Sequence, residues 1–251
     1  MDPSEPWLPF ARPDSAARLR LFCLPFAGGG ATVYRPWSQG LPPTVQVCAV
    51  QPPGRETRFR EPAFTRMPPL VAALADALGP HLGRPFALFG HSLGALVAFE
   101  LARELRRRGP RAPERLIVSG HGAPHVPPRR RPIHALPDDE FRAELRRLNG
   151  TPAAVLDNEE LMRMLTPTLR ADLAVAETYA LAAGPPLDCP ILALGGAQDT
   201  LAPPPDVDAW REHTRATFEL RIVPGDHFFL LSHRPLLLQA VGRYLESVQP
   251  A

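Results

Sequence analysis

Short apolar runs alternate with longer amphipathic segments along most of the chain, and this alternation is the feature that most restricts its fold. Strand-length apolar runs occupy residues 19–26, 45–50, 86–90, 115–120, 189–196 and 218–223. Helix-like patterns occupy residues 69–82, 93–108 and 235–248. Strands that alternate with helices form a parallel sheet whose faces those helices cover. We therefore expect a single α/β domain over residues 1–251, with a mostly parallel twisted sheet flanked by helices.

Residues 127–186 interrupt the alternation, because this segment has helical patterns but no convincing strand. We expect it to be a helical insertion between two strands, lying over the strand ends as a lid. Four of its apolar residues are expected to pack in the core of the lid, with contact to a bound substrate chain as the alternative. These residues are Leu161, Met162, Met164 and Leu165.

Composition and charge exclude several classes of function. Arginine supplies all 28 basic residues against 26 acidic ones, so the formal net charge is +2, which gives no global case for nucleic-acid binding. No apolar run approaches the roughly 18 residues of a membrane helix, and the acidic, proline-broken start is unlike a signal peptide. Cys23, Cys48 and Cys189 adjoin apolar runs, which indicates buried free thiols in a reducing compartment. We expect a cytoplasmic protein.

A glycine-flanked serine carries the first chemical signal. The sequence Gly-His-Ser-Leu-Gly at residues 90–94 follows a short apolar run and precedes a strongly patterned helix. This setting is typical of the nucleophile elbow of α/β-hydrolases, a strained turn that exposes the serine hydroxyl. The alternative is a tight turn whose serine only caps the helix. The motif predicts an α/β-hydrolase fold with Ser92 as the nucleophile.

A nucleophilic serine requires a base and an acid that orients the base, and in α/β-hydrolases both follow later strands, the acid first. His227 lies on the loop after residues 218–223 and is the candidate base. Asp199 follows residues 189–196 and is the candidate acid. Asp226 is a rival for that role, but consecutive side chains usually diverge. The other histidines, including His91 beside the serine, have no comparable placement.

Two backbone N–H groups are needed to stabilise the tetrahedral oxyanion. The residue after the nucleophile, Leu93, supplies one, and Ala27 in the glycine-rich loop after the first strand is the candidate for the second. That loop has the alternative of a flexible turn or phosphate-binding loop, but the sequence has no dinucleotide-binding or Walker pattern. It has no Cys/His cluster suited to zinc. We expect chemistry that needs no cofactor or metal.

Six ordered blocks resemble the free-standing type II thioesterases that accompany polyketide synthases and nonribosomal peptide synthetases. The blocks are LFCLPFAGGGATVYRPW (21–37), VQPPGRETR (50–58), FGHSLGALVAFELAR (89–103), LRADLAVAETY (169–179), GGAQD (195–199) and GDHFFL (225–230). The resemblance gives Ser92, Asp199 and His227 the roles of nucleophile, acid and base, and Ala27 and Leu93 the oxyanion positions. Asp226 stands where glycine is common, and Leu93 where many members have methionine.

The resemblance implies an editing enzyme that hydrolyses stalled or aberrant acyl groups from the phosphopantetheine arm of acyl or peptidyl carrier domains. It implies a transient carrier partner and a monomeric enzyme without a cofactor. A cyclising acyltransferase, a carboxylesterase and a non-catalytic binding protein of the same fold remain alternatives. The arginine-dense stretches at residues 103–111 and 129–131 are expected to be solvated, with steering of an acidic carrier as the alternative.

Overall fold

The computed structural model describes residues 6–11, 17–109 and 111–246. Within these ranges six strands form one sheet in the order β2-β1-β3-β4-β5-β6, and every neighbouring pair is parallel. The strands are β1 (Leu19–Leu24), β2 (Val45–Ala49), β3 (Phe86–His91), β4 (Arg115–Ser119), β5 (Ile191–Gly196) and β6 (Phe218–Val223). The predicted parallel α/β sheet is confirmed. Because the strands are parallel, their carboxyl ends meet at one edge of the sheet.

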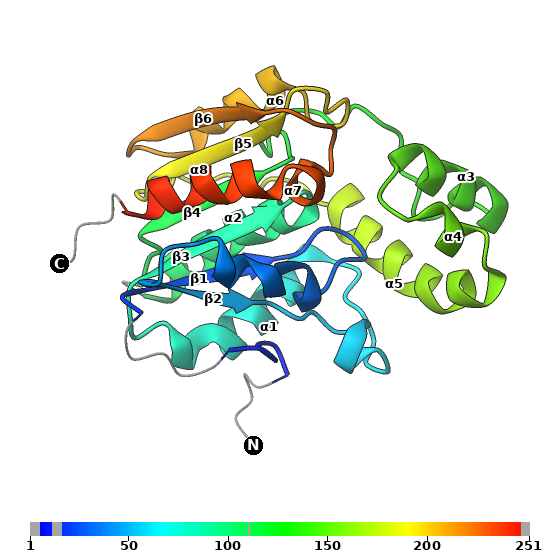
Figure 1. Cartoon of the computed structure of the whole chain (residues 1–251), viewed down its shortest axis with the longest axis horizontal. Helices are drawn as coiled ribbons and strands as arrows, with labels where there is room; N and C mark the ends of the chain where they lie inside the picture. The colour runs from blue at the N-terminus through cyan, green and yellow to red at the C-terminus, as the bar shows by residue number, and fades with distance from the viewer. Residues whose placement is uncertain (1–5, 12–16, 110, 247–251) are drawn as a thin grey trace.

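Helices cover both faces of the sheet, as Figure 1 shows. They include α1 (Met67–Leu78), α2 (Leu93–Arg108), η1 (Ala31–Gln39) and α8 (Arg234–Glu246), where η denotes a 3₁₀ helix. Alternate residues of one strand point to opposite faces, so Phe22 packs in the core beneath α1 and α2, and Leu21 in the core beneath η1 and α8. Because both faces of the sheet are covered, the residues on both sides of a central strand are buried, and such a strand is a continuous apolar run in the sequence.

Three helices lie between β4 and β5, where the sequence predicts a helical insertion. They are α3 (Asp138–Leu148), α4 (Ala153–Leu156) and α5 (Glu159–Glu177), and they project beyond one edge of the sheet in Figure 1. Met162 is buried in their small core and Leu165 packs against it, as expected. Met164 is 42% exposed, so its predicted burial is wrong. The insertion stands beside the strand ends rather than against a face of the sheet.

Some element boundaries differ from those predicted. The run at 19–26 leaves the sheet after Leu24, and the helix predicted over 69–82 begins at Met67 and ends at Leu78. Of the last predicted helix, residues 247–248 lie outside the described residues. Five short elements have no clear sequence signal: η2 (Glu56–Arg58), η3 (Gly79–His81), α6 (Pro204–Asp208), η4 (Ala209–His213) and α7 (Phe229–Ser232). Each is too short to show helical periodicity.

Two further expectations concern the cysteines, which the sequence predicts to be buried free thiols, and membrane-spanning helices. Cys23, Cys48 and Cys189 are free and buried, as predicted. Burial raises the pKa of the Cys48 thiol to about 12 and that of the Cys189 thiol to about 11. Among the described residues, no helix combines the length and apolar character needed to cross a membrane.

Candidate active site

Ser92 lies in a sharp turn between β3 and α2, and its φ of 53° is in the left-handed region that L-residues rarely adopt. Two glycines make this turn possible. A Cβ at Gly90 would lie 1.9 Å from the carbonyl oxygen of Gly94, and a Cβ at Gly94 would lie 2.2 Å from the carbonyl oxygen of Leu24. The G-x-S-x-G pattern is therefore the sequence consequence of two backbone contacts, and the strained turn exposes the hydroxyl.

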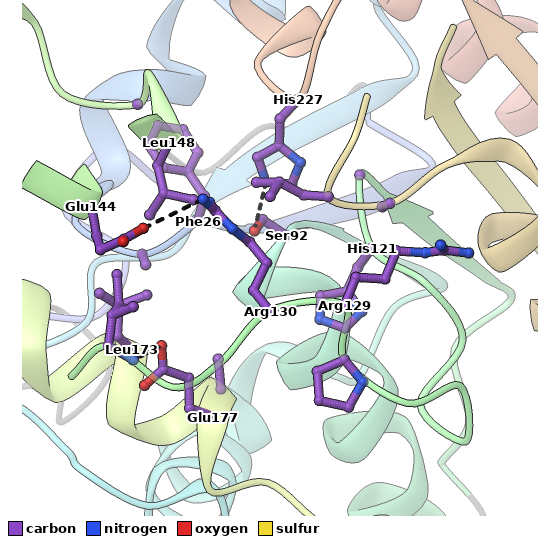
Figure 2. A pocket seen from close by; sticks show the side chains of 18 of the residues that line it. Phe26, Ser92, His121, Arg129, Arg130, Glu144, Leu148, Leu173, Glu177 and His227 are labelled. Atoms are coloured by element: carbon purple, nitrogen blue, oxygen red, sulfur yellow. Dashed lines mark hydrogen bonds and ion pairs between the residues drawn. The ribbon is translucent and has the colours of Figure 1, made fainter. Parts of the chain in front are cut away.

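Three side chains from three different strand ends form one hydrogen-bonded series. The His227 Nε2 lies 3.0 Å from the Ser92 Oγ, and its Nδ1 lies 2.9 Å from Oδ2 of Asp199. Figure 2 shows His227 above Ser92 at the cavity. The other Asp199 oxygen accepts hydrogen bonds from the Leu201 and Ala202 N–H groups. The structure thus brings together the serine, histidine and aspartate that the sequence singles out.

Asp226, the rival for the acid role, is occupied elsewhere. Its Oδ1 accepts a hydrogen bond from the Phe228 N–H at 3.0 Å, and its Oδ2 lies 3.5 Å from Nδ2 of Asn149 on the lid. Its carboxylate therefore caps its own turn, while Asp199 binds the ring of His227. Of the two aspartates that the sequence offers, Asp199 is the one that contacts the His227 ring.

The loop after β1 forms a tight turn beside Ser92. The Gly29 N–H donates to the Phe26 carbonyl at 2.8 Å, and Gly28 has a φ of 79°. The N–H and C=O of one trans peptide point in opposite directions. The Ala27 N–H is therefore directed away from the interior of this turn. Ala27 lines the same cavity as Ser92, and Leu93 is the first residue of α2, where helix N–H groups lack helical partners.

His91 has a structural role that sequence reasoning missed. Its Nε2 lies 2.9 Å from the His227 carbonyl oxygen and its Nδ1 lies 2.9 Å from the Ser119 Oγ. Complete burial holds the pKa of His91 well below its usual value, so the ring is neutral. A carbonyl only accepts, so Nε2 carries the proton and Nδ1 accepts from Ser119. The position of His91 next to Ser92 is the one sequence signal for this role, whereas from the sequence the histidines are weighed only as candidate bases.

Ser92 and His227 open into a cavity of about 500 Å³, a size usual for small-molecule sites. Much of its wall is apolar and comes from the lid and the loop after β1, including Phe26, Leu145, Leu148, Leu169 and Leu173. Charged side chains also reach it: Figure 2 shows Arg130 extending to Glu144, whose carboxylate lies 3.5 Å from the guanidinium. The arrangement suits an acyl chain entering beside a nucleophilic serine.

Carboxylates of the same chain compensate several of the arginines. Arg129 makes two hydrogen bonds to Asp206, and both Arg130 and Arg131 lie near Glu144. On α2, Arg108 pairs with Glu104 at 2.6 Å. These pairs favour the solvated, internally balanced surface over a strongly basic patch. In the part of the chain that the structure describes, no cluster of three or more His, Cys, Asp or Glu residues could hold a metal ion.

Comparison with known proteins identifies the family. The family model described as "Thioesterase domain" matches residues 19–245. "Linear gramicidin dehydrogenase LgrE" of Brevibacillus parabrevis is 46% identical over 244 residues, covering 96% of this chain and 93% of the relative. The solved RedJ thioesterase from the prodiginine pathway of Streptomyces coelicolor has 43% identity and a TM-score of 0.85, covering 94% of this chain and 90% of that chain.

The solved type II thioesterase BorB, from the borrelidin biosynthetic cluster, also has 43% identity, with a TM-score of 0.84 and coverage of 93% of this chain and 95% of that chain. The name of LgrE describes a dehydrogenase, whereas both solved structures are named thioesterases. The hydrogen-bonded series from Ser92 to Asp199 has the geometry of a serine hydrolase. The chain belongs to the thioesterase family, whose members are hydrolases that act on thioesters.

Proposed function

We propose that this thioesterase removes stalled or aberrant acyl groups from the phosphopantetheine arm of carrier domains in polyketide or nonribosomal peptide synthesis. The observation that carries the proposal is the hydrogen-bonded series of Ser92, His227 and Asp199, of which Ser92 and His227 line a largely apolar cavity of about 500 Å³. The names of its relatives refer to gramicidin, prodiginine and borrelidin biosynthesis, which supports a synthase pathway as the setting.

In the first half of the reaction, His227 takes the proton of Ser92 as the Oγ attacks the thioester carbonyl carbon. The carbonyl oxygen becomes an oxyanion that the Ala27 and Leu93 N–H groups stabilise. Asp199 holds the His227 ring with Nε2 facing the serine and stabilises the imidazolium. When the intermediate collapses, the C–S bond breaks, the phosphopantetheine thiol takes the proton from His227, and the acyl group remains on Ser92.

The second half uses water in place of the serine. His227 takes a proton from a water molecule as the water oxygen attacks the acyl-Ser92 ester carbon. The same two N–H groups stabilise the second oxyanion. Collapse breaks the bond between that carbon and the Ser92 Oγ, which takes the proton back from His227, and the carboxylic acid leaves. These steps draw only on side chains, backbone amides and water, so the proposal includes no cofactor.

The setting of the reaction follows from the same features. The acyl chain enters the cavity among Leu145, Leu169 and Leu173, while the carrier domain stays outside and docks transiently. The three buried free cysteines are consistent with a reducing cytoplasm. We propose that the enzyme acts there as a monomer, with the carrier as its partner.

Intact-mass spectrometry of an acylated carrier protein tests the proposed function. The carrier is incubated with the wild-type enzyme or with the Ser92→Ala variant, and short and medium acyl groups are compared. We expect the wild type alone to remove the acyl mass and to release the free acid. Hydrolysis of a simple oxoester without loss of any acyl group from the carrier would contradict the proposal and indicate a general esterase. Release as a cyclic product would indicate the cyclising alternative.

A further inference from the structure

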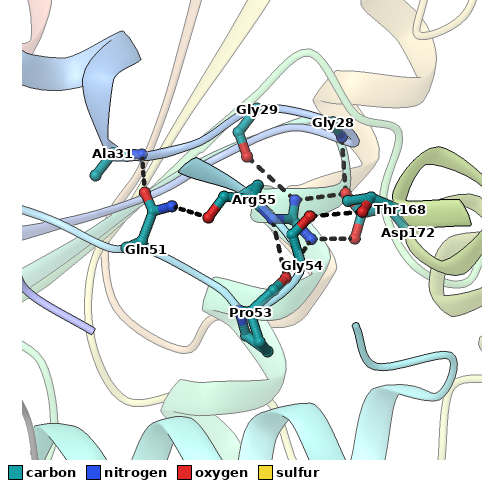
Figure 3. Close-up of polar contacts among 9 residues, drawn as sticks. All are labelled: Gly28, Gly29, Ala31, Gln51, Pro53, Gly54, Arg55, Thr168 and Asp172. Carbon is teal, nitrogen blue, oxygen red and sulfur yellow. Dashed lines mark hydrogen bonds and ion pairs between the residues drawn. The ribbon is translucent and has the colours of Figure 1, made fainter. Parts of the chain in front are cut away.

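A buried ion pair connects two distant segments beside the glycine-rich loop. Arg55 lies on the loop after β2, and Asp172 lies on lid helix α5. Their side chains form two hydrogen bonds, Nη1 to Oδ2 at 2.6 Å and Nη2 to Oδ1 at 2.8 Å, and are only 8% and 7% exposed. A guanidinium and a carboxylate joined in this way have a fixed mutual orientation. Figure 3 shows the pair next to Gly28 and Gly29.

Each partner also holds one peptide group of the loop. Oδ2 of Asp172 accepts a hydrogen bond from the Gly28 N–H at 2.7 Å, and Nη1 of Arg55 donates to the Gly29 carbonyl at 3.1 Å. Gly28 is the third residue of the turn from Phe26 to Gly29, and its φ of 79° fits a type II turn. The N–H at this position takes no part in the hydrogen bond that closes the turn. Asp172 supplies the acceptor that it needs.

Further hydrogen bonds fix the same segments to one another. The Gln51 side chain accepts from the Ala31 N–H at 2.7 Å and donates to the Arg55 carbonyl at 2.8 Å. On the lid helix, the Thr168 hydroxyl donates to the Gly54 carbonyl at 2.6 Å. Helix α5 is thus attached to the loop after β2 by its Thr168 and Asp172 side chains. The residue directly after Asp172 on the same helix, Leu173, lines the cavity.

We propose that Arg55 and Asp172 are positioning residues that orient the Ala27 N–H group toward the oxyanion. The same pair joins the loop that contains Ala27 to the lid helix. This inference rests on the proposed function. Asp172 fixes the peptide group directly after Ala27, so the loop keeps the turn that directs the Ala27 N–H away from its interior. A lone carboxylate there would repel the developing oxyanion. Arg55 balances that charge, so the pair gives orientation without a net negative field.

The test separates binding of the transition state from binding of the ground state. A trifluoromethyl ketone analogue of an acyl-pantetheine forms a tetrahedral adduct with Ser92 and places an oxyanion in the site, whereas the product acid does not. The dissociation constants of both ligands, kcat and KM are measured for the wild type, Asp172→Ala, Asp172→Asn and Arg55→Gln. Asp138→Asn is the matched control, because Asp138 also pairs with an α5 residue, Arg170, but its side chain is 83% exposed.

For Asp172→Ala we expect kcat and the affinity for the ketone to fall together by about 10- to 100-fold, somewhat less than the loss of an oxyanion donor itself. KM and the affinity for the acid should change by less than about threefold, since most substrate contacts remain. Asp172→Asn, which keeps an oxygen for the Gly28 N–H, should lose less than Asp172→Ala. Asp138→Asn should match the wild type. Equal weakening of ketone and acid, or no change in either, would overturn the inference.

Two further measurements remain informative if the single variants do not fold. The double variant Arg55→Met/Asp172→Leu removes both charges and leaves neither buried alone. We expect it to bind the acid normally and the ketone weakly; ketone binding as in the wild type would overturn the inference. In the wild-type enzyme the Gly28 amide hydrogen should exchange slowly with solvent, and fast exchange would contradict the bond to Asp172. Failure of the wild type to deacylate any carrier would instead reject the proposed function.

Discussion

His91 donates a hydrogen bond from Nε2 to the main-chain carbonyl of His227, with 2.9 Å between the two heavy atoms. The residue before Ser92 therefore holds the backbone of His227. His91 ends β3, a central strand of the sheet, so the loop that carries His227 is fixed to the most buried part of the fold. The distance of 3.0 Å between His227 and Ser92 thus depends on this contact as well as on Asp199.

Replacing Asp199 by asparagine should lower kcat by about 10³- to 10⁴-fold with little effect on KM. The carboxylate accepts from the His227 ring on one oxygen and from the Leu201 and Ala202 N–H groups on the other. An amide has one oxygen, so its NH₂ must face either the ring or the two N–H groups, and the ring loses its fixed tautomer. Steady-state hydrolysis of an acyl-pantetheine measures the effect.

Asp226→Asn is the matched control, since it makes the same chemical change next to the base. Its Oδ1 only caps the turn at the Phe228 N–H, a bond that asparagine can retain. We expect kcat within about threefold of the wild type, because the Asp226 carboxylate binds the Phe228 N–H and Asn149 rather than His227 or Ser92. A large loss in Asp226→Asn with normal activity in Asp199→Asn would reverse the assignment of the acid.

The free energy of unfolding should fall as the pH drops below about 6.5, the usual pKa of histidine. Burial lowers the pKa of His91 in the folded protein, so only the unfolded chain binds a proton there just below that pH. This stabilisation is fully present above about pH 6.5 and is lost toward the lower folded pKa, with a slope of about 1.4 kcal/mol per pH unit per histidine. Urea unfolding measures the free energy of unfolding of the wild type and of His91→Phe between pH 7.5 and 5.5. The free energy should fall less steeply with decreasing pH in His91→Phe, and an equal pH dependence in the two proteins would contradict this prediction.

Gly90→Ala should prevent the elbow from forming. The added Cβ would lie 1.9 Å from the Gly94 carbonyl oxygen, which is a backbone atom. A Cβ has no rotatable bond that could move it aside, so the backbone itself would have to shift. We expect a loss of at least about 3 kcal/mol in the free energy of unfolding, the range of severe core substitutions, or failure to fold. Gly79→Ala, where nothing lies within 4 Å of the added Cβ, should melt within a few degrees of the wild type. Similar melting temperatures for both variants would contradict the geometry of the turn.

Leu173→Trp should shorten the range of acyl groups that the enzyme accepts. Leu173 lines the cavity from α5, so the larger indole would fill cavity volume that a long acyl chain needs. We expect kcat/KM to fall by at least about tenfold for medium chains and to change little for acetyl or propionyl groups. Met164→Trp, on the exposed side of the same helix, should leave the chain-length profile unchanged. A parallel loss for all chain lengths would show that Leu173 does not limit the chain.

The fold and the meeting of Ser92, His227 and Asp199 could be predicted because their signals are local. Each parallel strand is a short apolar run, and Ser92, Asp199 and His227 each follow such a run, so their meeting at one edge is a consequence of the topology. The choice between Asp199 and Asp226 could be made because the latter is next to the base in the chain. Boundaries were less accurate where a 3₁₀ turn continues a helix, as after Leu78.

The supporting contacts could not be predicted in the same way. Arg55 and Asp172 are 117 residues apart, and nothing in the sequence around either residue indicates which residue it pairs with. Both lie in blocks that resemble the thioesterase family, but the resemblance assigned them no role. The bond from His91 to a backbone carbonyl likewise depends on the approach of two loops, and a carbonyl is present at every residue. Such contacts arise from packing of distant segments, which periodicity and spacing do not encode.

Trapping the acyl-enzyme tests whether Ser92 accepts the acyl group from a carrier thioester. Wild-type enzyme and acylated carrier are mixed, quenched in acid at successive times and weighed intact, and the enzyme is then digested and its peptides mapped. We expect the enzyme to gain the acyl mass transiently on the peptide containing Ser92 as the carrier loses it, and we expect Ser92→Ala to show neither change. Loss of the acyl group from the carrier in the Ser92→Ala sample, or an acyl group found on another residue, would contradict this expectation.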